Sequence, residues 1–257
     1  MAAKQMSRLE GAPTSYSTLM TQTVFITGNS SGLGFGLTDA YLSRGYEVYG
    51  LSRRGYAGIE NRSLHDVRCD LAQQSAIPPT LETLLGGVKE LALVILNAGI
   101  LGRIQSMTDT PLGDILHVMD INVWANKIIL DWLHARSTPV EQIVLISSGA
   151  AVKGNRGWGA YALSKAALNM LTQLYALEFP DTHLCAFAPG LVDTPMQDYL
   201  CDPGEVDVRQ YPSVQKLRTA RGTEAMPTPK EAAEQIIEVI TKLKDYPSGS
   251  FVDIRTI

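Results

Sequence analysis

The sequence has little cysteine. Its 257 residues contain three, Cys69, Cys185 and Cys201, which lie far apart. An odd number at wide separations fits neither a disulfide framework nor clustered metal ligands. The four histidines are also scattered along the chain. We therefore expect no metal site, and a reducing location, the cytoplasm.

Long apolar runs and clusters of positive charge are missing as well. We find no stretch long enough to span a bilayer and no secretion signal. Lysine and arginine number 22 against 26 acidic residues, which gives a net charge of −4. No basic run stands out, so the surface offers no electrostatic footprint for nucleic acid or an anionic membrane. We expect neither as a partner.

The length and apolar content fit one large α/β core, because single domains of this size are common. Residues 1–22 are polar and mixed, and we expect them to form a flexible N-terminal extension. A role for this extension in covering the active site or a neighbouring subunit stays open. The domain itself is expected over residues 23–257.

A glycine-rich turn follows a short β-branched run at Thr23–Thr27 and opens a helical pattern. The turn consists of Gly28, Asn29, Ser30, Ser31, Gly32, Leu33 and Gly34. Glycines allow the backbone to turn tightly and approach a pyrophosphate, which then lies on the free N–H groups of the helix. Strand, turn and helix together predict a dinucleotide-binding site.

Further strand-like runs alternate with helical patterns, which favours a doubly wound parallel sheet, the Rossmann fold. We expect strands at residues 47–51, within 62–71, and at 91–96, 143–146, 183–187 and 251–254. The run 91–96 is apolar throughout, as a central strand covered on both faces should be. Helices are expected at 81–85 after a break at Pro78-Pro79, from Pro111 towards Trp132, over 161–179, and from Thr228 onwards.

Tyr161 and Lys165 are four residues apart, which predicts that they share one helix face, about 5–6 Å apart at Cβ. A nearby ammonium group favours the phenolate, so Lys165 is expected to lower the tyrosine pKa. Such a tyrosine could act as a general acid and base. The same spacing also arises by chance, and the accompanying dinucleotide site is what favours the catalytic interpretation.

Several motifs in order resemble the short-chain dehydrogenase/reductase family. They are the glycine turn, Asn97-Ala98-Gly99, Asn122, Ser148, Tyr161 with Lys165, and Pro189-Gly190 with Thr194. The resemblance is close from Thr23 to Phe187 and thins after Thr194. Leu96 departs from the family pattern, which commonly has an asparagine there.

The resemblance implies a catalytic set. Tyr161 would transfer the alcohol proton, Lys165 would hold the cofactor ribose, and Ser148 would bond the substrate oxygen. Asn122 would hold a water in a proton relay, although a polar residue on a packed helix is the alternative. Ser147 would instead satisfy local backbone.

The resemblance also implies the cofactor-binding residues. These are the seven residues of the glycine turn, Ser52, Arg53, Asp70, Leu71, Asn97, Ala98, Gly99, Tyr161, Lys165, Pro189, Gly190, Val192 and Thr194. Asp70 could also cap a helix. The segment that ends at Thr194 would hold the nicotinamide carboxamide.

Ser52-Arg53-Arg54 stands where an enzyme that prefers NAD usually has an acidic residue. Arginine can bind phosphate through two parallel hydrogen bonds, so Arg53 predicts NADP(H) as the cofactor. Two solvated arginines in a loop are the alternative, more so for Arg54 than for Arg53.

Residues 191–227 correspond to the substrate loop of the family, and we expect 195–226 to be polar and irregular. Trp158 could line the substrate pocket or simply pack on its loop. The helix of Tyr161 is apolar around much of its circumference, which predicts a homodimer; a monomer with a thick core is the alternative. The chain end differs from the segment common in tetrameric relatives.

The sequence thus predicts an NADP(H)-dependent oxidoreductase that interconverts a small-molecule carbonyl and a secondary alcohol by hydride transfer. The alternative is a non-catalytic protein that binds and senses NADPH on the same fold, because fold does not fix function.

Overall fold

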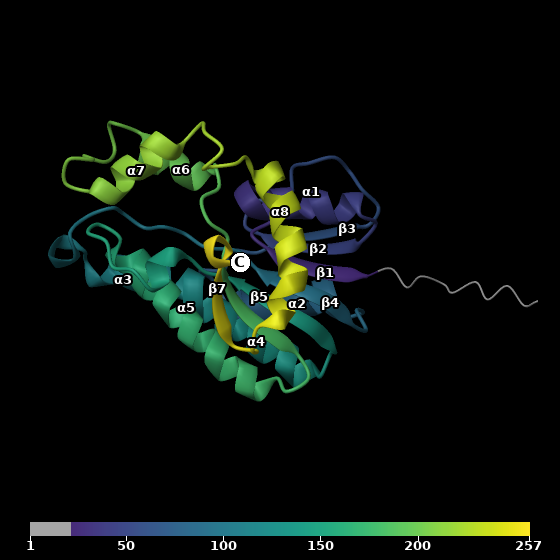
Figure 1. Ribbon diagram of the computed structural model, residues 1–257. Helices are drawn as coiled ribbons and strands as arrows, with labels where there is room; N and C mark the ends of the chain where they lie inside the picture. The colour runs from purple at the N-terminus through teal and green to yellow at the C-terminus, as the bar shows by residue number, and fades with distance from the viewer. Residues whose placement is uncertain (1–21) are drawn as a thin grey trace, which may run out of the picture.

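The computed structural model describes residues 22–257, so the predicted extension lies, apart from Gln22, outside the described residues. Its centre is one seven-stranded parallel sheet in the order β3-β2-β1-β4-β5-β6-β7 (Figure 1). The strands are β1 Thr23–Thr27, β2 Glu47–Ser52, β3 Leu64–Arg68, β4 Leu91–Leu96, β5 Val140–Ile146, β6 His183–Ala188 and β7 Ser250–Asp253. The predicted doubly wound parallel sheet is confirmed.

Helices cover both faces of the sheet, and each face has its own apolar core. Helices α1 (Gly32–Ser43) and α8 (Pro229–Lys242) bury one face. The other face is buried by α2 (Ile77–Leu85), α4 (Ala125–Arg136) and α5 (Gly159–Glu178). Two covered faces explain why β4 carries apolar residues throughout rather than in alternation.

The predicted long helix from Pro111 towards Trp132 exists but contains an irregular turn. Helix α3 (Leu112–Met119) passes into a π-helical segment, Asp120–Trp124, and then into α4. The amide of Ala125 donates to the carbonyl of Asp120, five residues back, as a π-turn requires. Asn122 lies in this segment, and such turns occur frequently at functional sites.

Pro78 and Pro79 start helix α2 instead of breaking the chain before it, so the expected boundary was wrong. Helix α2 begins at Ile77 and places proline in its first turn. Amide groups in a first turn have no partner within the helix, so proline costs no hydrogen bond there. Its ring also fixes a helical φ in advance.

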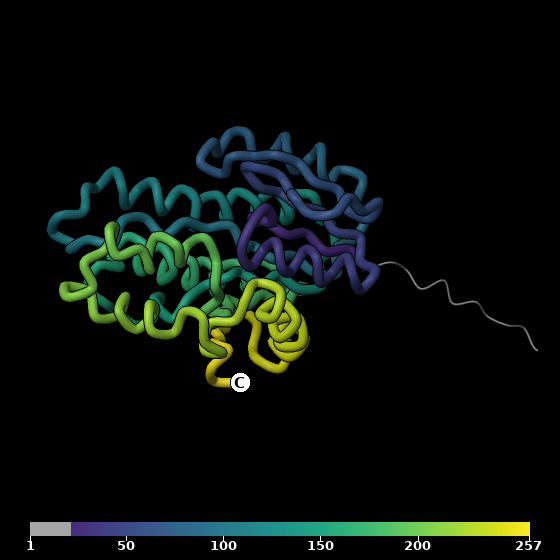
Figure 2. The backbone as a smooth tube through the Cα atoms, turned by 90° about the horizontal axis from the view of Figure 1, so that it is seen from above, coloured from purple at the N-terminus to yellow at the C-terminus, as the bar shows by residue number. Residues whose placement is uncertain are grey.

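The prediction that residues 195–226 are irregular was wrong too. This segment, called here the α6–α7 insert, contains α6 (Pro195–Cys201) and α7 (Pro212–Ala220), which lie together at one end of the molecule (Figures 1 and 2). The two ends of the insert are joined where the amide of Asp193 donates to the carbonyl of Pro227 at 2.9 Å. The insert is therefore a folded unit on a narrow connection.

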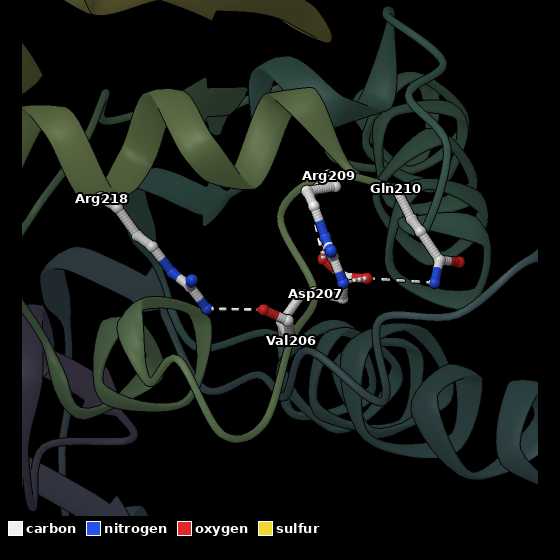
Figure 3. Close-up of polar contacts among 5 residues, drawn as sticks. All are labelled: Val206, Asp207, Arg209, Gln210 and Arg218. Atoms are coloured by element: carbon white, nitrogen blue, oxygen red, sulfur yellow. Dashed lines mark hydrogen bonds and ion pairs between the residues drawn. The ribbon is translucent and has the colours of Figure 1, made fainter.

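Arg218 on α7 holds the stretch between the two helices. Its guanidinium donates to the carbonyls of Leu200 at 3.1 Å, Asp202 at 2.6 Å and Val206 at 2.8 Å. Figure 3 shows the bond to Val206, beside the pairing of Asp207 with Arg209 and Gln210. One cation thus satisfies carbonyls at and beyond the end of α6, where helical partners run out.

Within residues 22–257 no helix is long and apolar enough to cross a membrane. The same part of the chain contains no group of three or more histidine, cysteine or acidic side chains placed to hold a metal ion.

Gly36 is where α1 and α8 cross most closely, because a Cβ atom there would overlap the carbonyl oxygen of Pro229. We expect Gly36→Ala to lower the free energy of unfolding by about 1–3 kcal/mol, as forced overpacking does. The matched control is Gly113→Ala on α3, where a Cβ meets no atom within 4 Å. The control should be neutral or stabilising by up to about 1 kcal/mol. Urea unfolding measures both, and equal effects would contradict this account of the crossing.

Candidate functional site

The glycine turn between β1 and α1 leaves room for a ligand to approach the backbone. Gly28 and Gly32 have φ of +72° and +56°, which side chains rarely tolerate. A Cβ at Gly34 would overlap the carbonyl oxygen of Gly28. Ser31, at the N-cap of α1, makes no side-chain capping bond, and the first turn holds no acidic residue. The free N–H groups at the N-terminus of α1 can therefore donate hydrogen bonds to a bound anion.

The end of β4 lies directly against this turn. The amides of Asn97 and Ala98 donate to Thr27 Oγ1 at 3.0 and 3.1 Å, and Asn97 Nδ2 donates to the carbonyl of Thr27 at 3.0 Å. A Cβ at Gly28 would lie 2.9 Å from the Cα of Ala98. The two predicted motifs thus meet at the carboxyl edge of the sheet, where open α/β sheets bind ligands.

The segment after β6 approaches the same turn from the other side. A Cβ at Gly32 would lie 3.1 Å from the methyl group of Thr194. Gly190 has φ of +78°, and Val192 is buried in the core beneath α1 and α8. Together with Pro189 next to them, these predicted residues form the wall opposite Asn97.

The end of β2 brings one arginine onto the glycine turn, and it is not the one that the sequence favoured. Both arginines are exposed; Arg54 donates to Ser31 Oγ at 2.7 Å, and the structure records no hydrogen bond of the Arg53 side chain within the described residues. Ser52 is buried and accepts from the amide of Gly55 at 3.2 Å. Asn29 is fully buried; its Nδ2 donates to Asp66 at 2.7 Å, and its Oδ1 has no partner among the described residues.

Asp70 and Leu71 follow β3. Asp70 accepts from the amide of Ala72 at 3.1 Å within the loop after β3. It does not cap a helix as the alternative proposed, because Gln73 and Ala76 hold the N-cap positions of the helical segments that follow. The side chain of Leu71 is buried in the core on the α2 face of the sheet.

Tyr161, Lys165 and Asn122 gather near Gly99. Lys165 is 4% exposed, and its Nζ donates to the carbonyl of Ile146 at 2.7 Å. A Cβ at Gly99 would lie 3.2 Å from Asn122 Oδ1 and 3.5 Å from Lys165 Nζ. The ammonium group also lies 5.6 Å from the centroid of the Tyr161 ring.

Asn122 is fully buried and all its amide atoms are engaged. Its Oδ1 accepts from the amide of Ile100 at 2.8 Å, and its Nδ2 donates to the Ile100 carbonyl at 2.8 Å and to Ser164 Oγ at 2.9 Å. Its side chain therefore ties the segment after β4 to α5, one residue before Lys165.

Burial controls the pKa values of the two central groups. It raises the pKa of the Tyr161 phenol, and the hydrogen bond with Ser148 lowers that pKa by a smaller amount. Burial also lowers the pKa of Lys165 to about 8. The expectation that Lys165 lowers the tyrosine pKa is thus not met in the protein alone. The Lys165 ammonium is bonded to the Ile146 carbonyl, and burial dominates at Tyr161.

Ser148 and Ser147 differ in their partners. Ser148 Oγ accepts from the amide of Ala150 at 3.1 Å and lies close enough to the Tyr161 phenol to lower its pKa. Ser147 Oγ donates to the side chain of Asn169 on α5 at 2.5 Å, rather than to local backbone as expected.

The sequence missed an apolar cluster that joins the α6–α7 insert to the rest of the site. Its buried members are Leu101, Ile104, Leu200, Val206, Tyr211, Val214, Leu217 and Met226, and Trp158 and Tyr161 pack against it. Trp158 packs here and its indole N–H bonds Ser213 on α7, so it contacts the insert and not merely its own loop. The apolar spacing of Leu101 and Ile104 after Asn97-Ala98-Gly99 was the available signal.

With this geometry in place, similar proteins identify the class. A family model described as short chain dehydrogenase matches residues 22–203. An uncharacterized oxidoreductase of Schizosaccharomyces pombe is 34% identical over 182 residues, 68% of this chain and 72% of that protein. A benzil reductase of Bacillus subtilis is 27% identical over 241 residues, 90% of this chain and 97% of that protein.

Solved structures agree on the fold. A short chain dehydrogenase family protein of Francisella tularensis has a TM-score of 0.74 at 23% identity, over 91% of this chain and 97% of that one. ElxO with NADP bound has a TM-score of 0.71 at 22% identity, over 91% and 97%. The chain belongs to the short-chain dehydrogenase/reductase family. It is an oxidoreductase with a Rossmann fold.

The lowered pKa of Lys165 predicts a pH-dependent stability difference. Between about pH 8 and 10.5 the unfolded chain keeps this proton while the folded chain loses it, so stability should rise with pH in that window. Relative to Lys165→Met, which cannot titrate, the unmodified protein should gain roughly 1–3 kcal/mol across the window. Urea unfolding of both proteins without cofactor at pH 7 to 10 measures this. A difference that stays constant with pH would contradict the lowered pKa.

Proposed function

We propose that this protein reduces a carbonyl group of a small molecule to a secondary alcohol, with NADPH as the hydride donor. One observation carries the proposal. Lys165, Asn122 and the phenol of Tyr161 with Ser148 converge on the edge of the sheet that also carries the glycine turn. The likeness to benzil reductases supports a carbonyl compound as substrate. We also place the activity in the cytoplasm, with neither nucleic acid nor a membrane as partner.

The residues present fit a nicotinamide dinucleotide. The close backbone approach at Gly28 and the uncapped N-terminus of α1 suit a pyrophosphate, and the unpartnered Asn29 Oδ1 can accept from a ribose hydroxyl. When bound, the cofactor supplies a hydride. Thr194, with Pro189, Gly190 and Val192, would hold the carboxamide of the nicotinamide.

In this proposal, side chains of the protein donate the proton and position the reacting groups. A phenol whose pKa is raised by burial stays protonated at neutral pH, so Tyr161 can donate its proton to the forming alkoxide. The hydroxyl of Ser148 orients the carbonyl oxygen, and Lys165 holds the ribose close to Tyr161. Asn122 fixes the segment after β4 and continues the proton path. The complete set, with relatives named as reductases and dehydrogenases, favours this reaction over a non-catalytic NADPH sensor.

Replacing Tyr161 by phenylalanine tests the proposal directly. The Tyr161→Phe variant should keep the fold and bind NADPH, yet turn over carbonyl compounds about 100-fold more slowly or worse, because the donated proton is gone. The measurement is loss of NADPH absorbance with a panel of ketones and aldehydes. Tyr175→Phe, the same change on the same helix at a phenol bonded to Asp131, is the control and should retain turnover. Near-normal turnover in Tyr161→Phe would refute the assignment.

We further propose NADP(H) rather than NAD(H), with both Arg53 and Arg54 contacting the 2′-phosphate. Arg54 already reaches the glycine turn through Ser31, and Arg53 is exposed beside it. No acidic residue stands at the end of β2 to repel the phosphate or to bond an unmodified ribose. Structural neighbours include proteins with NADP and with NADH bound, so this chain's own residues carry the choice.

The preference should be measurable as affinity. A hydrogen bond to a charged group contributes about 1.5–3 kcal/mol, which predicts roughly ten- to hundredfold tighter binding of NADPH than NADH. Arg53→Ala and Arg54→Ala should each weaken NADPH binding and leave NADH binding nearly unchanged. Arg62→Ala, an exposed arginine before β3, is the control. Equal affinity of the unmodified protein for both cofactors at low salt would refute the preference.

We also propose a homodimer formed by the outer face of α5. This face exposes four large apolar side chains, Leu163, Met170, Leu174 and Leu177, and exposed patches of this kind mark interaction surfaces. Light scattering at micromolar concentration should give the mass of two chains, and Leu174→Glu should shift it towards one. Ile59→Glu, at an exposed apolar residue elsewhere, should leave the mass unchanged. A single-chain mass for the unmodified protein would contradict the dimer.

A further inference from the structure

The apolar cluster described above packs against Tyr161. Leu101 and Ile104 contribute to it from the segment after β4, and the α6–α7 insert contributes all its other buried members. The insert meets this segment again where the amide of Ile104 donates to Tyr199 Oη at 3.1 Å. A substrate whose carbonyl oxygen lies on Tyr161 and Ser148 would have the cluster and Trp158 as neighbours of the rest of the molecule.

Trp158 is the largest side chain on the catalytic side of the cluster, and its orientation is fixed. Its indole N–H donates to Ser213 Oγ on α7 at 2.8 Å. Its ring centroid lies 6.0 Å from that of Tyr161, three residues further along the chain. The ring of Tyr211, in the insert, packs against Gly157, where a side chain would leave no room for it. Trp158 thus stands next to the proton donor, with Tyr211 packed against the residue before it.

Three charged side chains close to the cluster have partners, whereas Arg103, between Leu101 and Ile104, is exposed. Arg218 binds backbone carbonyls, and Arg221 pairs with Asp193 at 2.9 Å and with Asp198 at 2.5 Å. Arg156 lies over the Tyr211 ring at 5.9 Å and bonds Ser106.

Two neutral amides beside the cluster have a buried polar atom without a hydrogen-bond partner among the described residues, Gln105 Nε2, next to Ile104, and Gln197 Oε1, on α6. Asp193 Oδ1 is also buried, and its charge is paired with Arg221. A charged substrate group would lose its hydration here without gaining a counter-ion, which is costly. A neutral ring gains apolar burial and aromatic contacts instead.

We infer that the substrate is an uncharged carbonyl compound with an aromatic ring next to the carbonyl group, and that Trp158 is the residue that selects it. The inference rests on the proposed function. The carbonyl carbon gains the hydride of NADPH and the oxygen gains the proton of Tyr161, so the ketone is reduced while NADPH is oxidised. Ser213 is a positioning residue, because it acts by orienting the Trp158 indole.

Four α-keto compounds test the aromatic ring and the charge separately. Methyl benzoylformate and benzoylformate carry the ring, methyl pyruvate and pyruvate lack it, and benzoylformate and pyruvate carry a negative charge. The unmodified protein with NADPH should reduce methyl benzoylformate with kcat/KM at least about tenfold above each of the others, since an aromatic contact and an avoided desolvation each contribute roughly that factor. Higher kcat/KM for benzoylformate than for its methyl ester would overturn the inference and make Arg156 the partner of the carboxylate. Equal rates for methyl benzoylformate and methyl pyruvate would overturn the aromatic preference.

Variants of Trp158 are compared by the ratio of kcat/KM for methyl benzoylformate to kcat/KM for methyl pyruvate. A merely structural role of Trp158 would leave this ratio unchanged. Trp158→Ala should lower kcat/KM for methyl benzoylformate about tenfold more than for methyl pyruvate. Trp158→Phe and Ser213→Ala keep an aromatic side chain and should lower the ratio by a smaller factor, mainly through KM. Trp132→Phe, at a tryptophan of α4 that stacks with Arg136, should leave the ratio unchanged. A ratio that stays constant in all Trp158 variants would overturn the assignment.

The outcomes also separate this inference from the proposed function. If none of the four compounds consumes NADPH, or if Tyr161→Phe consumes it equally well, the proposed reaction fails and the selection falls with it. If methyl pyruvate and methyl benzoylformate are reduced alike in a Tyr161-dependent way, the reaction stands and the aromatic selection alone is refuted.

Discussion

The close approach of β1 and β4 at their carboxyl ends is the constraint on which the site depends. The hydroxyl of Thr27 accepts from two successive amides, those of Asn97 and Ala98, and Gly28 has no room for a side chain against Ala98. These contacts fix the glycine turn on one side and Gly99 on the other. Gly99 in turn leaves the space into which Asn122 and Lys165 reach from different helices. Adding one methyl group at Gly28 would therefore displace both the anion-binding turn and the catalytic edge.

Burial, rather than pairing with an opposite charge, governs the electrostatics at that edge. The lysine is held by a neutral carbonyl, and the phenol lies against apolar side chains of the insert. Desolvation disfavours the charged form of each group, so it raises the pKa of the phenol and lowers that of the ammonium group to about 8. The protein thus keeps a neutral acid next to a weakly held cation, and a bound anionic cofactor would favour the charged form of that cation.

Sequence predicted the sheet well because its signals are local. Most strands of the sheet appear as β-branched or apolar runs, and the motifs that follow β1, β4 and β5 lie at one edge by the geometry of parallel strands. The failures involve contacts between residues distant in sequence. Arg218 organises carbonyls 12 to 18 residues away, and Arg54 bonds a serine 23 residues earlier. The pKa of Tyr161 depends on burial among side chains from several parts of the chain. No spacing rule encodes such partners.

The narrow connection of the α6–α7 insert bears on how such a protein can change. The insert leaves and rejoins the body at neighbouring points, Asp193 and Pro227, and Arg218 satisfies its internal carbonyls without help from the sheet. Substitutions within it can reshape the walls around a substrate while the glycine turn and the proton donor keep their places. Substrate specificity and chemistry are thus carried by different parts of the chain, which can diverge at different rates. An engineer could exchange the insert without rebuilding the glycine turn or the proton donor.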